Sequence, residues 1–303
     1  MKAVVIKSGN YSQVINRTYN TREWEEYAEN AAAIAGALRR LGCECLVLQD
    51  GVFLPEKLHK LRPDIAWICS GGIQGHDPAT HLPGLLEMLG IKYVGSRPIA
   101  SGMADNKAVA KMVAIRSGIP TPEYYLICAD VALADVMHGH SAYPLIVKPV
   151  CGLCACGVYR VDNIGELKSR VYQLRERYKN DVLIEEFVDG VDVAVSIIDT
   201  PHGPCAFPAM QRFFQSAFLP DDKTHRLQHS MATLREGEPT RALLSDSVYC
   251  KVIQYSEVMF RSLGLRHFAR VDFRIREEEV FLLEVTHKPD MTPGGVFVRS
   301  AAL

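Results

Sequence analysis

Short apolar runs alternate with amphipathic stretches through the first third of the chain. Three apolar runs of four residues occur at 3–6, 45–48 and 65–68. Residues 23–41 and 81–89 carry apolar positions at helical spacing, and a short apolar segment follows at 92–94. Strands that are apolar on both faces and alternate with helices are typical of a parallel sheet covered by helices. The pattern therefore predicts an N-terminal parallel α/β subdomain over 1–95.

Beyond residue 95 the pattern predicts a mixed α/β (α+β) architecture in two further subdomains, 96–187 and 188–303. Helical spacing predicts helices at 104–117, 163–178 and 243–263. Alternation predicts strands at 144–148, 157–161, 182–187, 191–198, 268–275 and 280–285. The first two of these strands are expected to form a hairpin with a flexible tip at 151–157, and the last two an antiparallel pair. The polar passage 212–240 has little periodicity, and loops of that length are uncommon unless they are functional or mobile.

Composition and charge narrow the class of protein. The 303 residues are 48% hydrophobic and 23% charged, and the formal net charge is -1. These values predict a globular protein with no overall field to recruit nucleic acid or a membrane surface. No stretch of the sequence approaches the ~20 apolar residues of a membrane span. The apolar run at the start of the chain is too short for a signal peptide. We therefore expect the nine cysteines to be reduced thiols and the location to be cytoplasmic.

Charged residues interrupt the two final apolar strands. Arg270 and Asp272 are two positions apart and share one face of a strand, and Glu284 lies within the apolar run 281–285. A carboxylate in such a run is costly to desolvate unless it is paired or bound to a metal. Two carboxylates beside an arginine suit Mg²⁺ bound to a triphosphate, because Mg²⁺ takes carboxylate and phosphate oxygens and guanidinium binds phosphate. A structural salt bridge between Arg270 and one acid is the alternative.

Two further features suit a nucleotide. Lys148 closes an apolar strand before the glycine-bearing hairpin tip, where backbone N–H groups and a lysine can contact phosphate; a solvent-facing strand end is the alternative. Alternation places Glu185 and Phe187 on one face, shortly before Asp192. An acid, an aromatic ring and a free strand edge are what adenine and ribose binding uses, although an acid at a strand end is also common.

Together these residues keep an order that resembles the D-alanine–D-alanine ligase family of ATP-grasp enzymes. Residues 84–96 are similar to its segment G-L-L-E-x-x-G-I-P-Y-x-G-S, and residues 100–107 to A-S-x-x-x-x-D-K, with Asn106 in place of the aspartate. The later matches are Lys148-Pro149, Glu185, the strands around 269–273 and 283–285, Pro289 and Met291-Thr292. The resemblance spans about residues 82–292 and implies an ATP-grasp fold behind an N-terminal parallel-sheet subdomain.

The resemblance also implies roles for matching positions. The implied ATP contacts are Lys107 and Lys148 for the phosphates, Glu185, Phe187 and Val188 for the adenine, and Asp192 for the ribose. The implied ligands for Mg²⁺ or Mn²⁺ are Asp272, Glu284 and Thr286. Arg270 would stabilise the transferring phosphoryl group. The family phosphorylates a carboxylate and lets an amine attack the acyl phosphate, and 212–240 would act as a lid that excludes water.

The departures from the family fall mainly on the substrate side. Thr286 stands where the family has a metal-ligand asparagine, and Gly295 lies near a serine that fixes the substrate carboxylate. Asp290 replaces a glycine whose backbone helps form the oxyanion site, and an acid there opposes catalysis unless it turns away or binds an amine. His76 lies in a loop similar to the family's H-G-x-x-G-E-D-G segment and is a second tentative substrate contact.

The hairpin tip is also rewritten, because residues 153–157 (LCACG) stand where the family has G-S-S-x-G. Cys151, Cys154 and Cys156 have no clear fourth ligand, which favours small apolar replacements over a zinc site. The retained nucleotide half predicts an ATP-dependent carboxylate–amine ligase that forms an amide bond, with an amino acid as one substrate. The alternatives are a true D-alanine–D-alanine ligase of cell-wall synthesis and a non-catalytic ATP-binding protein. The predicted partners are a small carboxylate and a small amine, and the resemblance implies a possible homodimer.

Overall fold

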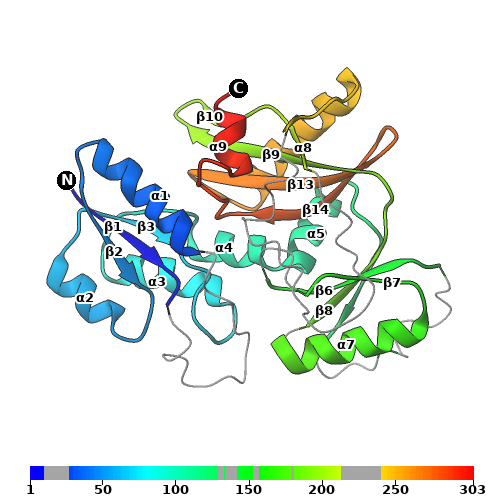
Figure 1. The fold of residues 1–303 in the computed structure, drawn as a ribbon, viewed down its shortest axis with the longest axis horizontal. Helices are drawn as coiled ribbons and strands as arrows, with labels where there is room; N and C mark the ends of the chain where they lie inside the picture. Colours follow the sequence, from blue (N-terminus) through cyan, green and yellow to red (C-terminus); the bar gives the residue numbers. More distant parts are fainter. Residues whose placement is uncertain (10–26, 129–132, 134–141, 153–156, 179–180, 213–239) are drawn as a thin grey trace.

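The computed structural model describes the chain outside six segments. These are residues 10–26, 129–132, 134–141, 153–156, 179–180 and 213–239. The described residues form three sheets with helices packed around them (Figure 1). The predicted lid, apart from its two ends, and two of the three hairpin cysteines lie outside the described residues.

The N-terminal sheet is parallel, as the sequence predicts. Its strand order is β2 (Glu44–Gln49), β1 (Lys2–Lys7), β3 (Ile65–Cys69) and β4 (Tyr93–Val94). The helices on it are α1 (Tyr27–Arg40), α2 (Leu54–Leu61) and α3 (His81–Met88), with a 3-10 turn, η2 (Pro78–Thr80), before α3. Ala3 and Val5 pack in a core with α1, while Val4 and Ile6 pack in a core with α2 and α3. The run 3–6 is wholly apolar because both faces of β1 are covered.

The central sheet is antiparallel and carries one long helix. Its strand order is β5 (Tyr124–Ile127), β8 (Val182–Glu186), β6 (Leu145–Pro149) and β7 (Tyr159–Val161). The predicted hairpin is confirmed, because β6 and β7 pair antiparallel with Leu145 opposite Val161. Helix α7 (Ile164–Tyr178) covers one face, where Leu167, Val171 and Leu174 join the core of this sheet (Figure 1).

The third sheet is the largest and holds the final two strands. Its strand order is β12 (Thr240–Arg241), β11 (Met210–Arg212), β9 (Val191–Thr200), β13 (Phe268–Arg276) and β14 (Glu279–Thr286), with β10 (Gly203–Ala206) paired to β9. Helices α8 (Asp246–Ser262) and α9 (Val296–Ala301) pack against it. The strands β13 and β14 pair antiparallel, which confirms the predicted pairing at the end of the chain.

The helix predicted at 104–117 is confirmed over most of its length, but it begins at Lys107 and a separate helix precedes it. Two helices occupy this stretch, α4 (Pro98–Asp105) and α5 (Lys107–Arg116), and Asn106 between them has an extended backbone. The Asn106 side chain accepts a hydrogen bond from the Val109 N–H at 3.1 Å and so starts a second helix instead of continuing the first. Alanines of α4 and α5 join the core of the third sheet, and α5 lies between that sheet and the central one (Figure 1). The division at 95 and 187 stays a prediction.

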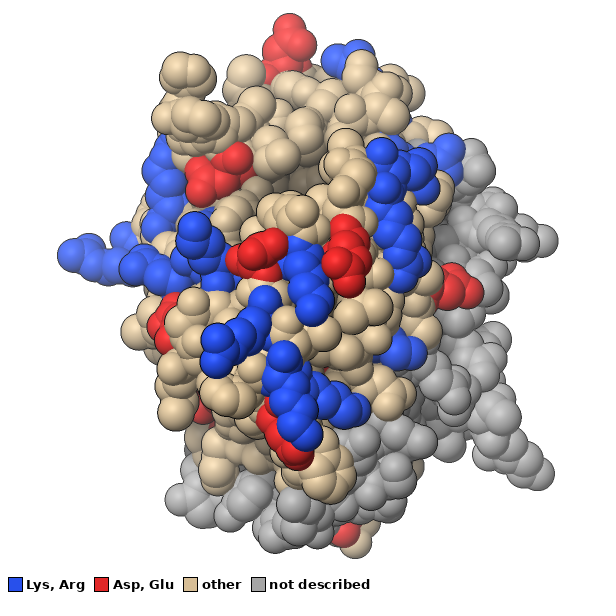
Figure 2. Space-filling view, turned by 90° about the vertical axis from the view of Figure 1, so that its left-hand side faces the viewer, with Lys and Arg blue, Asp and Glu red and all other residues tan. Residues whose placement is uncertain are grey.

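The outer end of the N-terminal region carries charges of both signs. Figure 2 shows Lys and Arg side chains gathered there, with Asp and Glu side chains between them. Over the part of the chain that the structure describes, no helix combines the length and apolarity that a membrane crossing needs.

The cap at Asn106 is open to a direct test. Asn106→Ala should lower the free energy of unfolding by about 1 kcal/mol, because the Val109 N–H loses its acceptor. Asn106→Asp keeps the acceptor and adds a negative charge at a helix N-terminus, so its stability should equal or slightly exceed that of the wild type. Urea unfolding followed by circular dichroism measures both, with the exposed Lys168→Ala as control. Equal losses for the alanine and aspartate variants would show that the side-chain oxygen is not the cap.

Candidate active site

Four polar side chains share one face of the third sheet. The register pairs Asp272 with Glu284 and Arg270 with Thr286 across β13 and β14. Directly opposed residues of antiparallel strands project to the same face, and so do residues two apart on one strand. Arg270, Asp272, Glu284 and Thr286 therefore lie together, at the ends of the strands where the resemblance places phosphoryl transfer and metal binding.

Asp272 is held by guanidinium groups. Arg270 Nε and Nη2 donate to its two carboxylate oxygens at 2.8 and 2.7 Å, and Arg212 Nη1 lies 3.5 Å from Oδ2. Arg270 Nη2 also lies 3.4 Å from Thr286 Oγ1. The bidentate pair fixes both side chains in one geometry. The salt bridge considered as an alternative from the sequence is thus present, and it places the arginine in contact with two of the three predicted metal ligands, Asp272 and Thr286.

Arg212 is a site residue that the sequence pattern did not reveal. It ends β11, which pairs antiparallel with β9 and so reaches the same sheet face from the far side. Burial lowers the pKa of its guanidinium, with the charge of Arg270 acting in the same direction and Asp272 opposing it. Arg212 stands at the start of the polar passage 212–240, whose lack of periodicity left it outside any predicted strand.

Glu284 is ionised in the folded protein. Its Oε2 lies 3.6 Å from Lys107 Nζ. Burial alone would raise the pKa of Glu284, but the charges of Lys107, Lys148 and Arg270 outweigh burial and lower it to about 2. A carboxylate that stays charged at neutral pH is ready to bind a cation without first losing a proton.

The donor set fits a hard divalent cation. Asp272 and Glu284 supply carboxylate oxygens on one face and Thr286 supplies a hydroxyl. In nucleotide sites Mg²⁺ takes one or two carboxylates and completes its shell with phosphate oxygens and water. Among the described residues, no cluster of three or more His, Cys, Asp or Glu side chains offers a competing metal site. The set therefore suits Mg²⁺ shared with a phosphate better than a closed all-protein metal cage.

Glu185 on β8 is buried between two lysines. Lys148 Nζ on β6 lies 2.7 Å from its Oε2, and Lys111 Nζ on α5 lies 2.7 Å from its Oε1. Burial would raise the pKa of Glu185, but the two lysines lower it below its usual value. For Lys111 burial lowers the pKa to about 8, although Glu185 opposes that shift. Lys111 was not among the predicted site residues, although it lies four residues after Lys107 and so on the same helix face.

Lys107 is placed by the first turn of α5. Its backbone N–H donates to the Val150 carbonyl at 3.0 Å, and its ammonium donates to the Gly152 carbonyl at 2.7 Å. The helix start is thus joined to the chain that follows β6. As a result Lys107 reaches Glu284 of the third sheet, and the charge of Lys148 on β6 also acts on that carboxylate.

The predicted adenine and ribose residues meet a third arginine. Arg274 donates from Nε to the Val188 carbonyl at 2.9 Å and from Nη1 to Asp192 Oδ2 at 2.6 Å. Its guanidinium carbon lies 5.6 Å from the centre of the Phe187 ring, and that of Arg160 lies 4.9 Å away. Burial raises the pKa of Asp192, against the opposing charge of Arg274. Arg274 lies two residues after Asp272, and this spacing could have identified it.

The turn after β14 brings together two departures from the family. Asp290 accepts hydrogen bonds from the Thr292 N–H at 2.8 Å and from Thr292 Oγ1 at 2.9 Å. A Cβ atom on Gly295 would lie 2.6 Å from the Asp290 carbonyl oxygen and 2.8 Å from its carboxylate. The carboxylate therefore fills the space that a serine at 295 would need. Burial raises the pKa of Asp290, while the Thr292 hydrogen bonds and the charge of Arg270 oppose that shift.

Helix α1 holds this turn from the N-terminal side. Asn30 Nδ2 donates to the Pro289 carbonyl at 3.4 Å, and the Met291 N–H donates to Asn30 Oδ1 at 2.8 Å. The backbone on both sides of Asp290 is therefore fixed by one asparagine. His76, the other tentative substrate residue, is exposed in the loop between β3 and η2, and its role stays a prediction.

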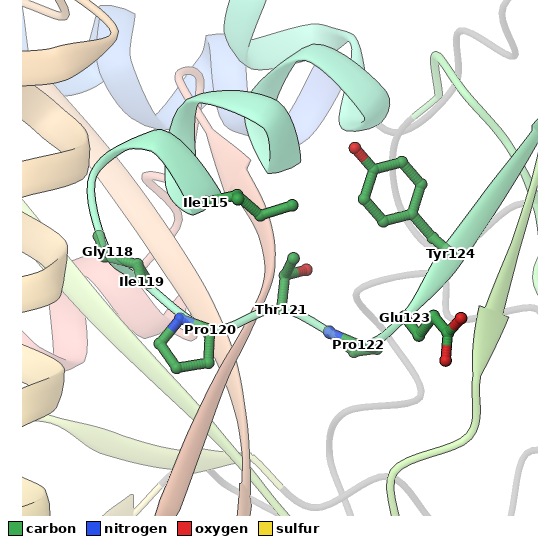
Figure 3. A pocket seen from close by; sticks show the side chains of 8 residues that line it. All are labelled: Ile115, Gly118, Ile119, Pro120, Thr121, Pro122, Glu123 and Tyr124. Carbon is green, nitrogen blue, oxygen red and sulfur yellow. The ribbon is translucent and has the colours of Figure 1, made fainter.

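A pocket of about 520 Å³ lies beside the connector between α5 and β5. Its walls include Ile115 at the end of α5, Thr121 in the connector and Tyr124 at the start of β5 (Figure 3). None of the predicted site residues lines it. The pocket lies next to the side chains that surround Lys111, because its lining residue Thr121 accepts a hydrogen bond from that lysine.

The chain is similar to D-alanine–D-alanine ligases in sequence and in fold. The family model for the D-ala D-ala ligase C-terminus matches residues 113–302. The D-alanine–D-alanine ligase of Geobacter sulfurreducens is 31% identical over 89% of this chain and 81% of that protein, and that of Aquifex aeolicus is 31% identical over 96% and 91%. The crystal structure of D-alanine–D-alanine ligase from Bacillus anthracis complexed with ATP matches with a TM-score of 0.78 at 21% identity. It covers 100% of this chain and 91% of that one, and it supports the same fold.

The Arg270–Asp272 pair should contribute to stability without any ligand. Asp272→Asn should lower the free energy of unfolding by roughly 3 kcal/mol, because it leaves two buried guanidinium groups without their shared carboxylate. The matched control is Asp162→Asn, whose exposed pair with Arg160 should contribute less than about 1 kcal/mol. Urea unfolding in nucleotide-free buffer with a chelator measures both. A loss no larger than the control's would show that the charges of this cluster do not stabilise the fold.

Proposed function

The chain belongs to the D-alanine–D-alanine ligase family of ATP-dependent ligases with the ATP-grasp fold, and on that premise we propose that it joins a small carboxylate to a small amine. One observation carries the proposal. Lysines 107 and 148 and Arg270 lie beside Asp272 and Glu284, where the central and third sheets face each other. That arrangement can neutralise a triphosphate and its metal, and family membership makes the chain an enzyme, which sets aside the non-catalytic alternative.

The proposed roles follow the geometry. Lys107 and Lys148 bind ATP phosphates, and Glu185, Phe187, Val188 and Asp192 receive the adenosine. Asp272, Glu284 and Thr286 hold Mg²⁺ or Mn²⁺, which when bound neutralises phosphate charge. Arg270, fixed by Asp272, stabilises the phosphoryl group during transfer. Because phosphoryl transfer depends mostly on positioning and charge, the ion pairs already formed among these residues are what the reaction needs.

The amine side is where we propose a substrate other than a second D-alanine. Asp290 places a carboxylate where a serine at 295 would lie, so this part of the site favours a positively charged or uncharged group over a carboxylate. An amino acid supplies the carboxylate that is phosphorylated, and His76 is a proposed further contact. The second candidate is a true D-alanine–D-alanine ligase, which the curated relatives at 31% identity favour. The cytoplasmic location and the possible homodimer stay predictions.

A screen for ADP release tests the proposed reaction. We expect ADP only when ATP, Mg²⁺, a suitable amino acid and a suitable amine are all present, because the acyl phosphate turns over only when an amine takes it. Products are identified by mass. Glu284→Gln should abolish release, while the exposed Glu56→Gln should leave it unchanged.

The screen has two contrary outcomes. Tight ATP binding without ADP release across a broad panel would count against ligase activity. Efficient formation of the D-alanine dimer, faster than any other product, would replace the altered-substrate proposal with the second candidate.

Asp290 and Gly295 should behave as a coupled pair. Gly295→Ser alone should cost stability, because its Cβ meets both the backbone carbonyl and the carboxylate of Asp290, whereas the double variant Asp290→Gly with Gly295→Ser should recover only the part of the loss that is due to the carboxylate. Asp290→Gly alone should raise KM for the amine by about tenfold, the size expected for losing one charge-assisted contact, with KM for ATP unchanged. Thermal unfolding and steady-state kinetics measure these effects. An equal rise in both KM values would mean that Asp290 does not contact the amine.

A further inference from the structure

Lys111 is a charged side chain with no exposed surface, in the middle of α5. Its ammonium group is 2.7 Å from Glu185 Oε1, donates to Thr121 Oγ1 and lies 3.4 Å from the Leu282 carbonyl oxygen. These partners come from β8, from the connector after α5 and from β14. Because groups from three elements enclose the ammonium, Lys111 keeps its place as long as the two sheets stay together.

Glu185 has one lysine on each carboxylate oxygen. Lys111 lies on Oε1 and Lys148 on Oε2, both at 2.7 Å. One negative and two positive charges leave this triad with a surplus positive charge. Lys148 is the less enclosed partner, near the end of β6, and its charge also acts on Glu284 across the site. The surplus charge can therefore be directed toward the metal-binding face.

We propose that Lys111 is the fixed counter-ion of Glu185, and that Lys148 exchanges between Glu185 and a nucleotide phosphate. The exchange rests on the proposed function, since it takes ATP as the ligand. While Lys111 holds Glu185, Lys148 can turn to phosphate without leaving a buried carboxylate unpaired. Without Lys111 the same movement leaves the Glu185 charge uncompensated in the interior, which is strongly unfavourable. Lys111 is thus a positioning residue that keeps Lys148 available to phosphate.

A purely structural role for Lys111 predicts something different. Thr121 and Tyr124 contact Lys111 and also line the pocket beside the connector (Figure 3). If Lys111 only joined this connector and β14 to the central sheet, its loss would loosen the site and weaken every ligand alike. If Lys111 frees Lys148, its loss weakens only ligands that carry phosphate. The difference between ATP and adenosine separates the two roles.

The test compares ATP with adenosine by titration calorimetry on the full chain. We expect Lys111→Met to weaken ATP by about tenfold relative to adenosine, the size of one lost charge–phosphate contact. Lys111→Arg keeps the charge and should restore most of the preference for ATP. The exposed Lys57→Met on α2 is the matched control and should change neither affinity.

A double variant keeps the test decisive if Lys111→Met does not fold. Lys111→Met with Glu185→Gln removes the buried charge together with its fixed partner, so Lys148 is released and the ATP-to-adenosine ratio should match the wild type's. An equal loss of ATP and adenosine in Lys111→Met, or a double variant that still disfavours ATP, overturns the exchange. Wild-type protein that binds neither ligand overturns the proposed function and this inference with it.

Discussion

The interior between the central and third sheets contains ionised side chains, and each of them must meet a partner of opposite charge or change its protonation state, a carboxylate by gaining a proton and a lysine by losing one. Glu185 meets this condition with Lys111 and Lys148, Asp272 with Arg270 and Arg212, and Asp192 with Arg274. Arg270 and Asp272 share β13, whereas the other pairs cross from one strand or helix to another, and Lys107 of α5 adds a pair with Glu284 of β14. These cross-element pairs therefore help to fix α5, β8, β13 and β14 relative to their neighbours.

The same constraint supplies the chemistry. A site built from paired charges has its arginines and lysines already oriented, so an incoming anion and cation exchange partners instead of ordering free side chains. Arg270 is the clearest case, because its two hydrogen bonds to Asp272 fix it beside Glu284 and Thr286. Stability and catalysis are then linked. A variant that removes one charge of the cluster loses a side chain that we propose acts in phosphoryl transfer. It also leaves the partner of that side chain without a counter-ion.

On the acceptor side, steric exclusion determines which side chains fit. Asp290 and Gly295 occupy one another's volume, and Asn30 of α1 holds the backbone around Asp290 from the N-terminal subdomain. A change at 290 in this chain therefore goes with the absence of a side chain at 295. The two departures from the family therefore lie in direct contact, through both the backbone carbonyl and the carboxylate of Asp290.

The sequence by itself determined the features that short-range periodicity encodes. The run 3–6 indicated a strand buried on both faces, the spacing of Arg270 and Asp272 indicated their common face, and family-like order predicted the nucleotide residues. Only the tertiary structure decided which charges meet. It moved the start of the predicted helix to Lys107, where the Asn106 side chain caps it, and it brought Lys111 to Glu185 and Arg212 to Asp272. Periodicity indicates which face of a helix or strand each residue lies on. Ion pairs depend instead on the distance between elements that are far apart in the sequence, and only the folded structure sets that distance.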